Sequence, residues 1–101
     1  MIERNFIMWE WDTAPLETAE LTLKSLEKNI IPADSIDETL PEAEVVIMKF
    51  LLQTQTQKKS FELSLITPPY ESILEHRWKE YTIQVKKVKD YTVKIKAFIN
   101  I

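Results

Sequence analysis

The chain has 101 residues, 45% of them hydrophobic, with no glycine and no cysteine. Without cysteine there is no disulfide, thiolate nucleophile or cysteine-based metal site, and without glycine the phosphate loops of nucleotide-binding enzymes are excluded. Residues 1–46 carry eleven carboxylates and three basic side chains, whereas residues 47–101 carry ten basic side chains and five carboxylates. The net charge of −3 therefore hides a charge-polarised chain, which favours a role in association.

The length and composition predict a single compact domain, residues 1–101. No secretory leader and no long apolar run stands in the sequence, so we expect a cytoplasmic protein without a membrane segment.

A first strand is predicted near the N-terminus from a partial alternation of apolar residues. Ile7, Trp9 and Trp11 lie on one face of this strand, and Phe6 and Met8 lie on the other. The two tryptophans are either core residues or exposed anchors for a partner, and we expect at least one of them to be buried.

Beyond this strand, apolar residues recur at spacings of three and four, which is typical of an amphipathic helix. Asp12 or Thr13 can cap its start, and Pro15 is tolerated in the first turn. Alternation at Ala19, Leu21 and Leu23 also fits a strand. The spacing predicts a helix with an apolar stripe of Leu16, Ala19, Leu23, Leu26 and Ile30.

Residues 31–44 contain two prolines and five carboxylates but no basic side chain, so they are predicted to be a connection. This segment is either a solvated linker, which we favour, or a docking loop for a basic partner. Catalysis by paired carboxylates requires a fixed separation, which a loop of this kind does not provide. The candidate partner-binding residues here are Asp34, Asp37, Glu38 and Glu42.

Residues 45–52 are apolar on both faces apart from Lys49, which predicts a buried strand. Phe61, Leu63 and Leu65 alternate with polar residues and predict its partner in a hairpin. We expect a turn of about four residues, because a two-residue turn of type I′ needs a positive φ that lysine resists.

Residues 67–69, Thr-Pro-Pro, are typical of a helix start, and the residues that follow have helical spacing. They predict a second helix with a stripe of Tyr70, Ile73, Leu74, Arg77, Trp78 and Tyr81. On this interpretation, Ile73→Asp would place a charge in the core and unfold the domain.

His76 is the only histidine, and it falls off the predicted stripe. No nucleophile or set of metal ligands stands at a suitable spacing from it, so we expect a surface or boundary residue. Replacing it is expected to leave the pH dependence of stability unchanged. The sequence therefore predicts no catalytic residue, no metal and no cofactor.

Residues 82–88 and 91–99 both alternate and predict a second hairpin, rich in lysine. Its lysines either contact phosphates, helped by aromatic stacking, or protect an edge strand from aggregation. Tyr91 is expected on the apolar face, away from the lysines, and the acidic net charge disfavours a dedicated nucleic-acid binder. The candidate partner-binding residues here are Lys86, Lys87, Lys89, Lys94 and Lys96.

The predicted order β-α-β-β-α-β-β gives an α+β fold, with two helices on one face of a mostly antiparallel sheet of about five strands. This layout resembles the ferredoxin-like superfold, which hosts many unrelated functions. We expect a non-enzymatic protein that associates with a protein partner or with itself, as an inhibitor, immunity-type protein, adaptor or homo-oligomer subunit. The docking strand is expected in residues 91–101, at a sheet edge. A nucleic-acid-binding module that uses the C-terminal lysines is the alternative.

Overall fold

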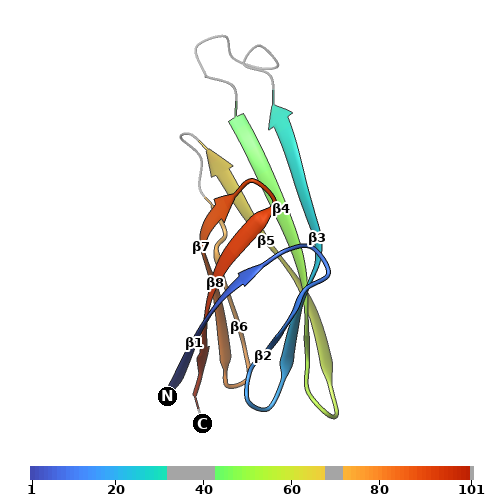
Figure 1. The fold of residues 1–101 in the computed structure, drawn as a ribbon, viewed down its shortest axis with the longest axis vertical. Helices are drawn as coiled ribbons and strands as arrows, with labels where there is room; N and C mark the ends of the chain where they lie inside the picture. Colours follow the sequence, from blue (N-terminus) through green and yellow to red (C-terminus); the bar gives the residue numbers. More distant parts are fainter. Residues whose placement is uncertain (32–42, 68–71, 101) are drawn as a thin grey trace.

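The computed structural model describes residues 1–31, 43–67 and 72–100. Within these ranges all regular secondary structure is β-strand, and no helix is present. The strands form two antiparallel sheets of four, in the orders β1-β8-β7-β6 and β2-β3-β4-β5 (Figure 1). The predicted α+β, ferredoxin-like fold is therefore wrong. The strands are β1 (Ile2–Met8), β2 (Thr13–Pro15), β3 (Glu20–Ile31), β4 (Ala43–Gln53), β5 (Lys58–Thr67), β6 (Glu75–Trp78), β7 (Tyr81–Lys89) and β8 (Thr92–Ile99).

The first strand pairs with the last one, in register from Ile2 opposite Ile99 to Met8 opposite Val93. This pairing brings the two ends of the chain to the lower end of the molecule in Figure 1. Because β8 lies between β1 and β7, it is an interior strand. The predicted docking edge in residues 91–101 is therefore wrong, and Ile101 itself lies outside the described residues.

One hydrophobic core fills the space between the two sheets. Strand alternation explains it, because every second residue from Val46 to Leu52 of β4, from Tyr81 to Val85 of β7 and from Val93 to Ile99 of β8 is apolar and buried. The largest fully buried side chains are Met8, Leu16, Leu21, Leu23, Met48, Phe50, Leu52, Leu63, Tyr81, Ile83, Ile95 and Ile99.

The first predicted helix is a turn followed by the long strand β3. Leu16 and Ala19 are buried where the chain turns between β2 and β3. Within β3 the register shifts between Leu23 and Ser25, so one extra residue separates Leu23 from the next buried side chain, Leu26. A turn and a bulge thus produced the spacings of three and four that we assigned to a helix.

The second predicted helix is also wrong over the part that the structure describes, and residues 68–71, including Tyr70, lie outside it. Trp78 ends β6, Tyr81 begins β7, and the two rings stack at 6.4 Å between centroids. Lys79, with φ of 54°, lies in the two-residue turn between them. Ile73 is 63% exposed, so Ile73→Asp would place its charge in solvent, contrary to the sequence-based expectation.

Both predicted hairpins are confirmed. Strands β4 and β5 pair from Glu44 opposite Thr67 to Gln53 opposite Lys58, around a loop of four residues. Thr54 closes this loop, since its hydroxyl accepts a hydrogen bond from the Gln57 amide at 3.0 Å. Strands β7 and β8 join through a two-residue turn.

Four residues of the described ranges have a positive φ although none is glycine: Trp11, Glu17, Lys79 and Asp90. Each lies in a connection between strands that glycine would ordinarily make. For an L-residue this conformation costs about 1–2 kcal/mol. The chain therefore carries local strain at its turns, and the expectation that lysine resists a positive φ does not hold at Lys79.

The two sheets differ in length at one end, where β3 and β4 extend beyond the β7–β8 hairpin (Figure 1). Lys28 and Ile30 follow Leu26 on the core-facing side of β3, opposite Val46 and Glu44 of β4. Both side chains are nevertheless exposed, Ile30 by 66%. The inner face of the longer sheet is thus partly uncovered at this end.

Candidate functional site

The turn between β1 and β2 presents two tryptophans to solvent. Its backbone is fixed at both ends, because the Trp9 amide donates to the Asp12 carboxylate at 2.8 Å and the Asp12 amide donates to the Trp9 carbonyl at 3.0 Å. Trp9 is 56% exposed, and Trp11, with φ of 72°, is 65% exposed. The expectation that at least one tryptophan is buried is therefore wrong.

A third aromatic residue, Tyr91, joins them from the tip of the β7–β8 hairpin. It is 61% exposed, because it lies in the turn beyond the end of the sheet and not on the apolar face where we expected it. Tyr91, Trp9, Glu10 and Leu26 line a shallow groove of about 330 Å³. We call the three exposed rings, Trp9, Trp11 and Tyr91, the aromatic end surface.

Two lysines of β3 lie over these rings. The Nζ atom of Lys28 is 4.8 Å from the centroid of the Tyr91 ring, and that of Lys24 is 5.1 Å from the Trp11 ring. Cation–π contacts at exposed positions contribute about 0.5–1 kcal/mol each, so they help to orient the rings. They also give the aromatic end surface a positively charged border.

The C-terminal lysines lie on the β7–β8 hairpin, as the sequence indicated. Lys87 of β7 is directly opposite Lys94 of β8, and both are exposed. Lys86 is the extra residue at a register shift between Val85 and Lys87. Like charges placed opposite one another destabilise a sheet. Among the described residues, no carboxylate forms an ion pair with Lys87 or Lys94, so their charges are not neutralised within the fold. This surface is therefore suited to an anionic ligand.

Of the remaining lysines of this group, Lys96 is less free. The ammonium of Lys96 is 3.4 Å from the Glu3 carboxylate and 6.0 Å from the centroid of the Phe98 ring. The Lys89 carbonyl accepts a hydrogen bond from the Thr92 hydroxyl at the end of the hairpin. The other group of predicted partner-binding residues, Asp34, Asp37, Glu38 and Glu42, lies outside the described residues.

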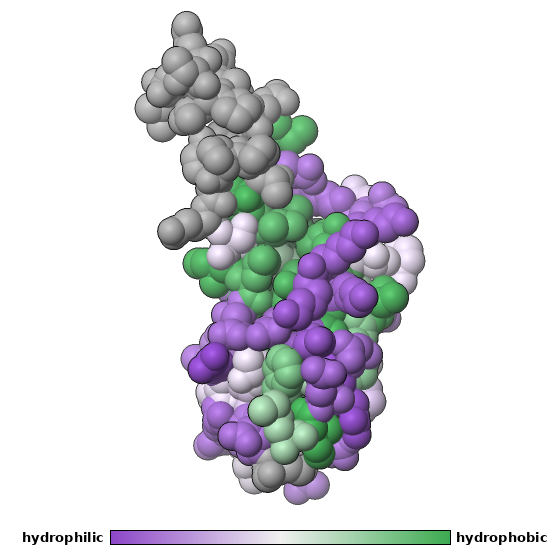
Figure 2. All heavy atoms as spheres, turned by 90° about the vertical axis from the view of Figure 1, so that its left-hand side faces the viewer, coloured by the Kyte–Doolittle hydropathy of each residue, from purple (hydrophilic) through white to green (hydrophobic). Residues whose placement is uncertain are grey.

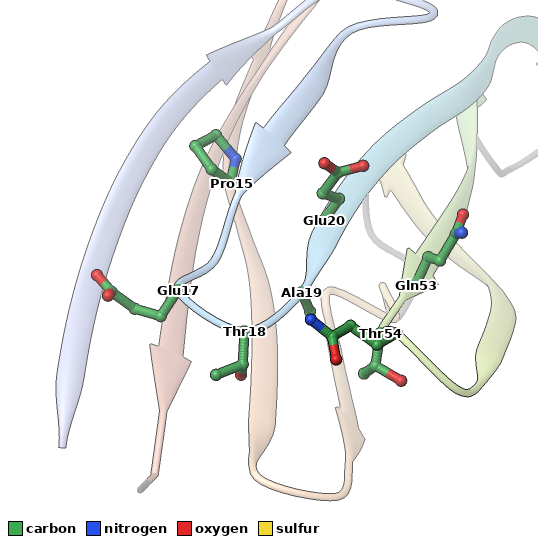
Figure 3. Close-up of a pocket in the computed structure, with 8 residues that line it drawn as sticks. Pro15, Glu17, Thr18, Ala19, Glu20, Gln53 and Thr54 are labelled. Atoms are coloured by element: carbon green, nitrogen blue, oxygen red, sulfur yellow. The ribbon is translucent and has the colours of Figure 1, made fainter.

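A polar hollow of about 370 Å³ lies between the β2–β3 turn and the β4–β5 loop (Figure 3). Figure 3 shows the carboxylates of Glu17 and Glu20 pointing away from one another. The Glu17 carboxylate forms an ion pair with Arg4. A pair of carboxylates acts as general acid and general base only when both point toward the same substrate atoms. Because these two point apart, we assign no catalytic role to the hollow.

His76 of β6 is a boundary residue, as expected, but it is packed against another strand. Its ring stacks on Phe61 of β5 with centroids 4.1 Å apart and planes 7° apart. The Nε2 atom is buried without a hydrogen-bond partner among the described residues. Burial lowers the pKa of His76 below its usual value of 6.5, and the positive charge of Lys59 lowers it further.

Contrary to the sequence-based expectation, His76 should therefore make stability depend on pH. With a folded-state pKa below the unfolded-state value, the unfolded chain binds the proton more readily, so stability is full above about pH 6.5 and falls as the solution is acidified. Urea denaturation at pH 8 and pH 5 should show a smaller acid loss in His76→Phe, which keeps the ring stack, than in the wild-type chain. Equal losses in both proteins would show that His76 does not contribute.

In the ranges that the structure describes, no three His, Asp or Glu side chains are grouped to hold a metal ion. Nor is any helix there long and apolar enough to cross a bilayer. Comparisons with protein-family models, with curated proteins and with solved structures found no match. The function is therefore argued from the surface of this chain.

The sequence pointed to part of this site only. It identified Trp9 and Trp11 as residues with two interpretations, but it assigned Lys24 and Lys28 to a helix and Tyr91 to the core. The bulge at Lys24 could not be recognised from the sequence. Glycine often marks a bulge, and this chain has none.

Proposed function

We propose that this chain is a non-enzymatic binding module that associates with another protein through the aromatic end surface. The observation that carries the proposal is that Trp9 and Tyr91, each more than half exposed, line one groove, and that Trp11, also more than half exposed, lies two residues from Trp9 in the same turn. Tryptophan and tyrosine are enriched among the residues that dominate interface energies, because they bury a large apolar area and keep a polar group.

The position of Trp11 also supports this proposal. A left-handed conformation in a non-glycine residue costs free energy, and such strain often marks a functional position. Here the strained residue is also an exposed tryptophan, which the fold does not use in its core. Because Glu17, Lys79 and Asp90 share this backbone conformation, it is the exposed ring of Trp11 that favours a role in contact with a partner.

Exposed apolar residues alone do not distinguish this surface. Ile7 and Ile73 are also more than half exposed. Figure 2 shows hydrophobic residues gathered in the upper half of one face, with a band of hydrophilic residues across its middle. The aromatic end surface differs because it combines large rings, a groove and lysines that lie over the rings. The cytoplasmic location expected from the sequence remains part of this proposal.

The proposal predicts that a protein captured from the native host's lysate by the wild-type chain is lost with Trp9→Ala and with Tyr91→Ala. Each substitution should weaken a purified complex about thirtyfold if the residue is an interface hot spot. The matched control is Ile73→Ala, which removes an equally exposed apolar side chain elsewhere and should bind like the wild type. Equal binding by all variants would contradict the proposal.

Nucleic-acid binding through the hairpin lysines is the second candidate, supported by the opposed pair Lys87 and Lys94. It predicts that a fluorescent single-stranded oligonucleotide binds, that salt weakens the complex steeply, and that Lys87→Gln with Lys94→Gln abolishes binding. Binding of this kind with no effect of Trp9→Ala would favour the second candidate over the first.

A further inference from the structure

The edge of β3 is open beyond the point where its neighbour ends. Strand β2 pairs only with the first part of β3, from Pro15 opposite Glu20 to Thr13 opposite Thr22. The Leu23 amide and carbonyl still bond to the β1–β2 turn, at Asp12 and Trp11. Past Leu23, no described strand pairs with this edge.

The direction of the backbone groups along this edge follows from the ladder. The Leu26 amide points away from β4, since it donates to the Glu10 carboxylate at 2.9 Å. Alternation then directs the amides and carbonyls of Lys28 and Ile30 outward as well, because the register with β4 is regular from Ser25 onward. Two residues of β3 thus offer an unoccupied donor and acceptor each within the described part of the fold.

We propose that this edge binds an extended segment of another protein, which adds to β3 as a further strand. The inference rests on the proposed function and specifies how the partner docks. On the inner face, the added strand would place its side chains opposite Leu26, Lys28 and Ile30 and beside the groove formed by Trp9 and Tyr91. Main-chain hydrogen bonds supply affinity in this mode, and alternate side chains supply specificity.

The charges on β3 define the chemistry of the segment. Lys28 stands between two apolar neighbours on the inner face, Leu26 and Ile30, so the complementary strand carries an acidic residue between two apolar ones. On the outer face, Glu27 favours a basic or polar neighbour. The partner segment is therefore an alternating strand with the inner pattern apolar, acidic, apolar.

A second copy of this chain fits the edge poorly. The antiparallel register centred on Lys28 places this residue opposite Lys28 of the second copy, and like charges in that position are unfavourable. The charge on Lys28 thus opposes self-association and favours an acidic segment from a different protein.

The test uses the full chain and a synthetic peptide, Thr-Val-Thr-Glu-Lys-Leu-Thr, whose alternate residues present valine, glutamate and leucine to the inner face. The control peptide exchanges its valine and glutamate, which removes the acidic residue from the position opposite Lys28. We expect tryptophan fluorescence to report binding of the first peptide at several-fold higher affinity. Amide hydrogen exchange at Lys28 and Ile30 should slow in the complex, which binding through side chains alone would not cause.

The decisive variant is Ile30→Pro, which removes an outward amide that the fold does not use and is therefore expected to fold. It should weaken peptide binding about tenfold relative to Ile30→Ala, the loss expected for a main-chain hydrogen bond. Lys28→Gln, which retains every backbone group, should weaken binding about two- to fivefold and reduce its dependence on salt. This second variant keeps the test decisive if the proline variant does not fold.

Several outcomes would overturn the inference. Peptide binding that Trp9→Ala reduces but Ile30→Pro leaves unchanged would retain the aromatic end surface as the binding site and reject strand addition. Self-association in sedimentation that Ile30→Pro abolishes would make a second copy the occupant. Failure of both peptides to bind at millimolar concentration would also reject strand addition, while the capture experiment with Trp9→Ala tests the proposed function separately.

Discussion

The Lys94→Pro variant is expected to be unfolded or severely destabilised, although the side chain of Lys94 is exposed. Lys94 lies in the interior strand β8, opposite Ile7 of β1 on one side and Lys87 of β7 on the other. Proline removes a hydrogen bond from the ladder and does not fit a central strand, at a cost on the order of 3 kcal/mol. Domains of this size have only about 5–15 kcal/mol of stability in total.

The matched control is Lys94→Ala, which removes the same charge but keeps the backbone amide. Its free energy of unfolding, measured by urea denaturation, should stay within about 0.5 kcal/mol of the wild-type value. The comparison also separates interior from edge strands, because Ile30→Pro at the open edge of β3 should lose much less. A folded Lys94→Pro variant with the midpoint of Lys94→Ala would show that β8 is not an interior strand.

The Ile83→Ala variant should lose about 2–5 kcal/mol of stability, the range for removing three carbons from a filled core. Ile83 of β7 is fully buried between the two sheets. Ile73, by contrast, is 63% exposed and meets the rest of the sheet through a single bridge to Ser64. Ile73→Ala is therefore expected to change the free energy of unfolding by no more than about 0.5 kcal/mol.

The Ile73 variant distinguishes a helical from an all-β arrangement of this region, with Ile83, which lies in a strand in either arrangement, as the buried reference. A helix would bury Ile73 in its apolar stripe, whereas the strand arrangement leaves Ile73 exposed. Chemical denaturation of both variants under the same conditions decides between them. A loss of several kcal/mol in Ile73→Ala would contradict the all-β structure at this point.

The candidate site shows why alternation in sequence is insufficient for placing a binding surface. The sequence correctly separated Phe6 and Met8 from Ile7 as two faces of one strand, but it placed Trp9 and Trp11 on the face of Ile7, whereas both lie in the turn after the strand. It did not show which face is buried, because both faces are apolar. The pairing of β1 with β8 decides this, since it turns Met8 into the core and leaves the tryptophans beyond the end of the sheet.

The sequence by itself determined the two hairpins, because β4 with β5 and β7 with β8 are neighbours joined by short turns and their alternation is easily recognised. It did not determine the rest of the fold. A bulge at Lys24 and a tight turn at Lys79 interrupt the alternation of the strands. The apolar residues on either side are then spaced by three or four, as in a helix.

Only the tertiary structure decided which strands have free edges. That outcome depends on the pairing of β1 with β8, which are separated by almost the whole chain, and on the short length of β2 beside the longer β3. Local periodicity contains no information about either feature, because it records which residues share a face and not which strand lies next to them. The aromatic end surface and the open edge of β3 both follow from these non-local pairings.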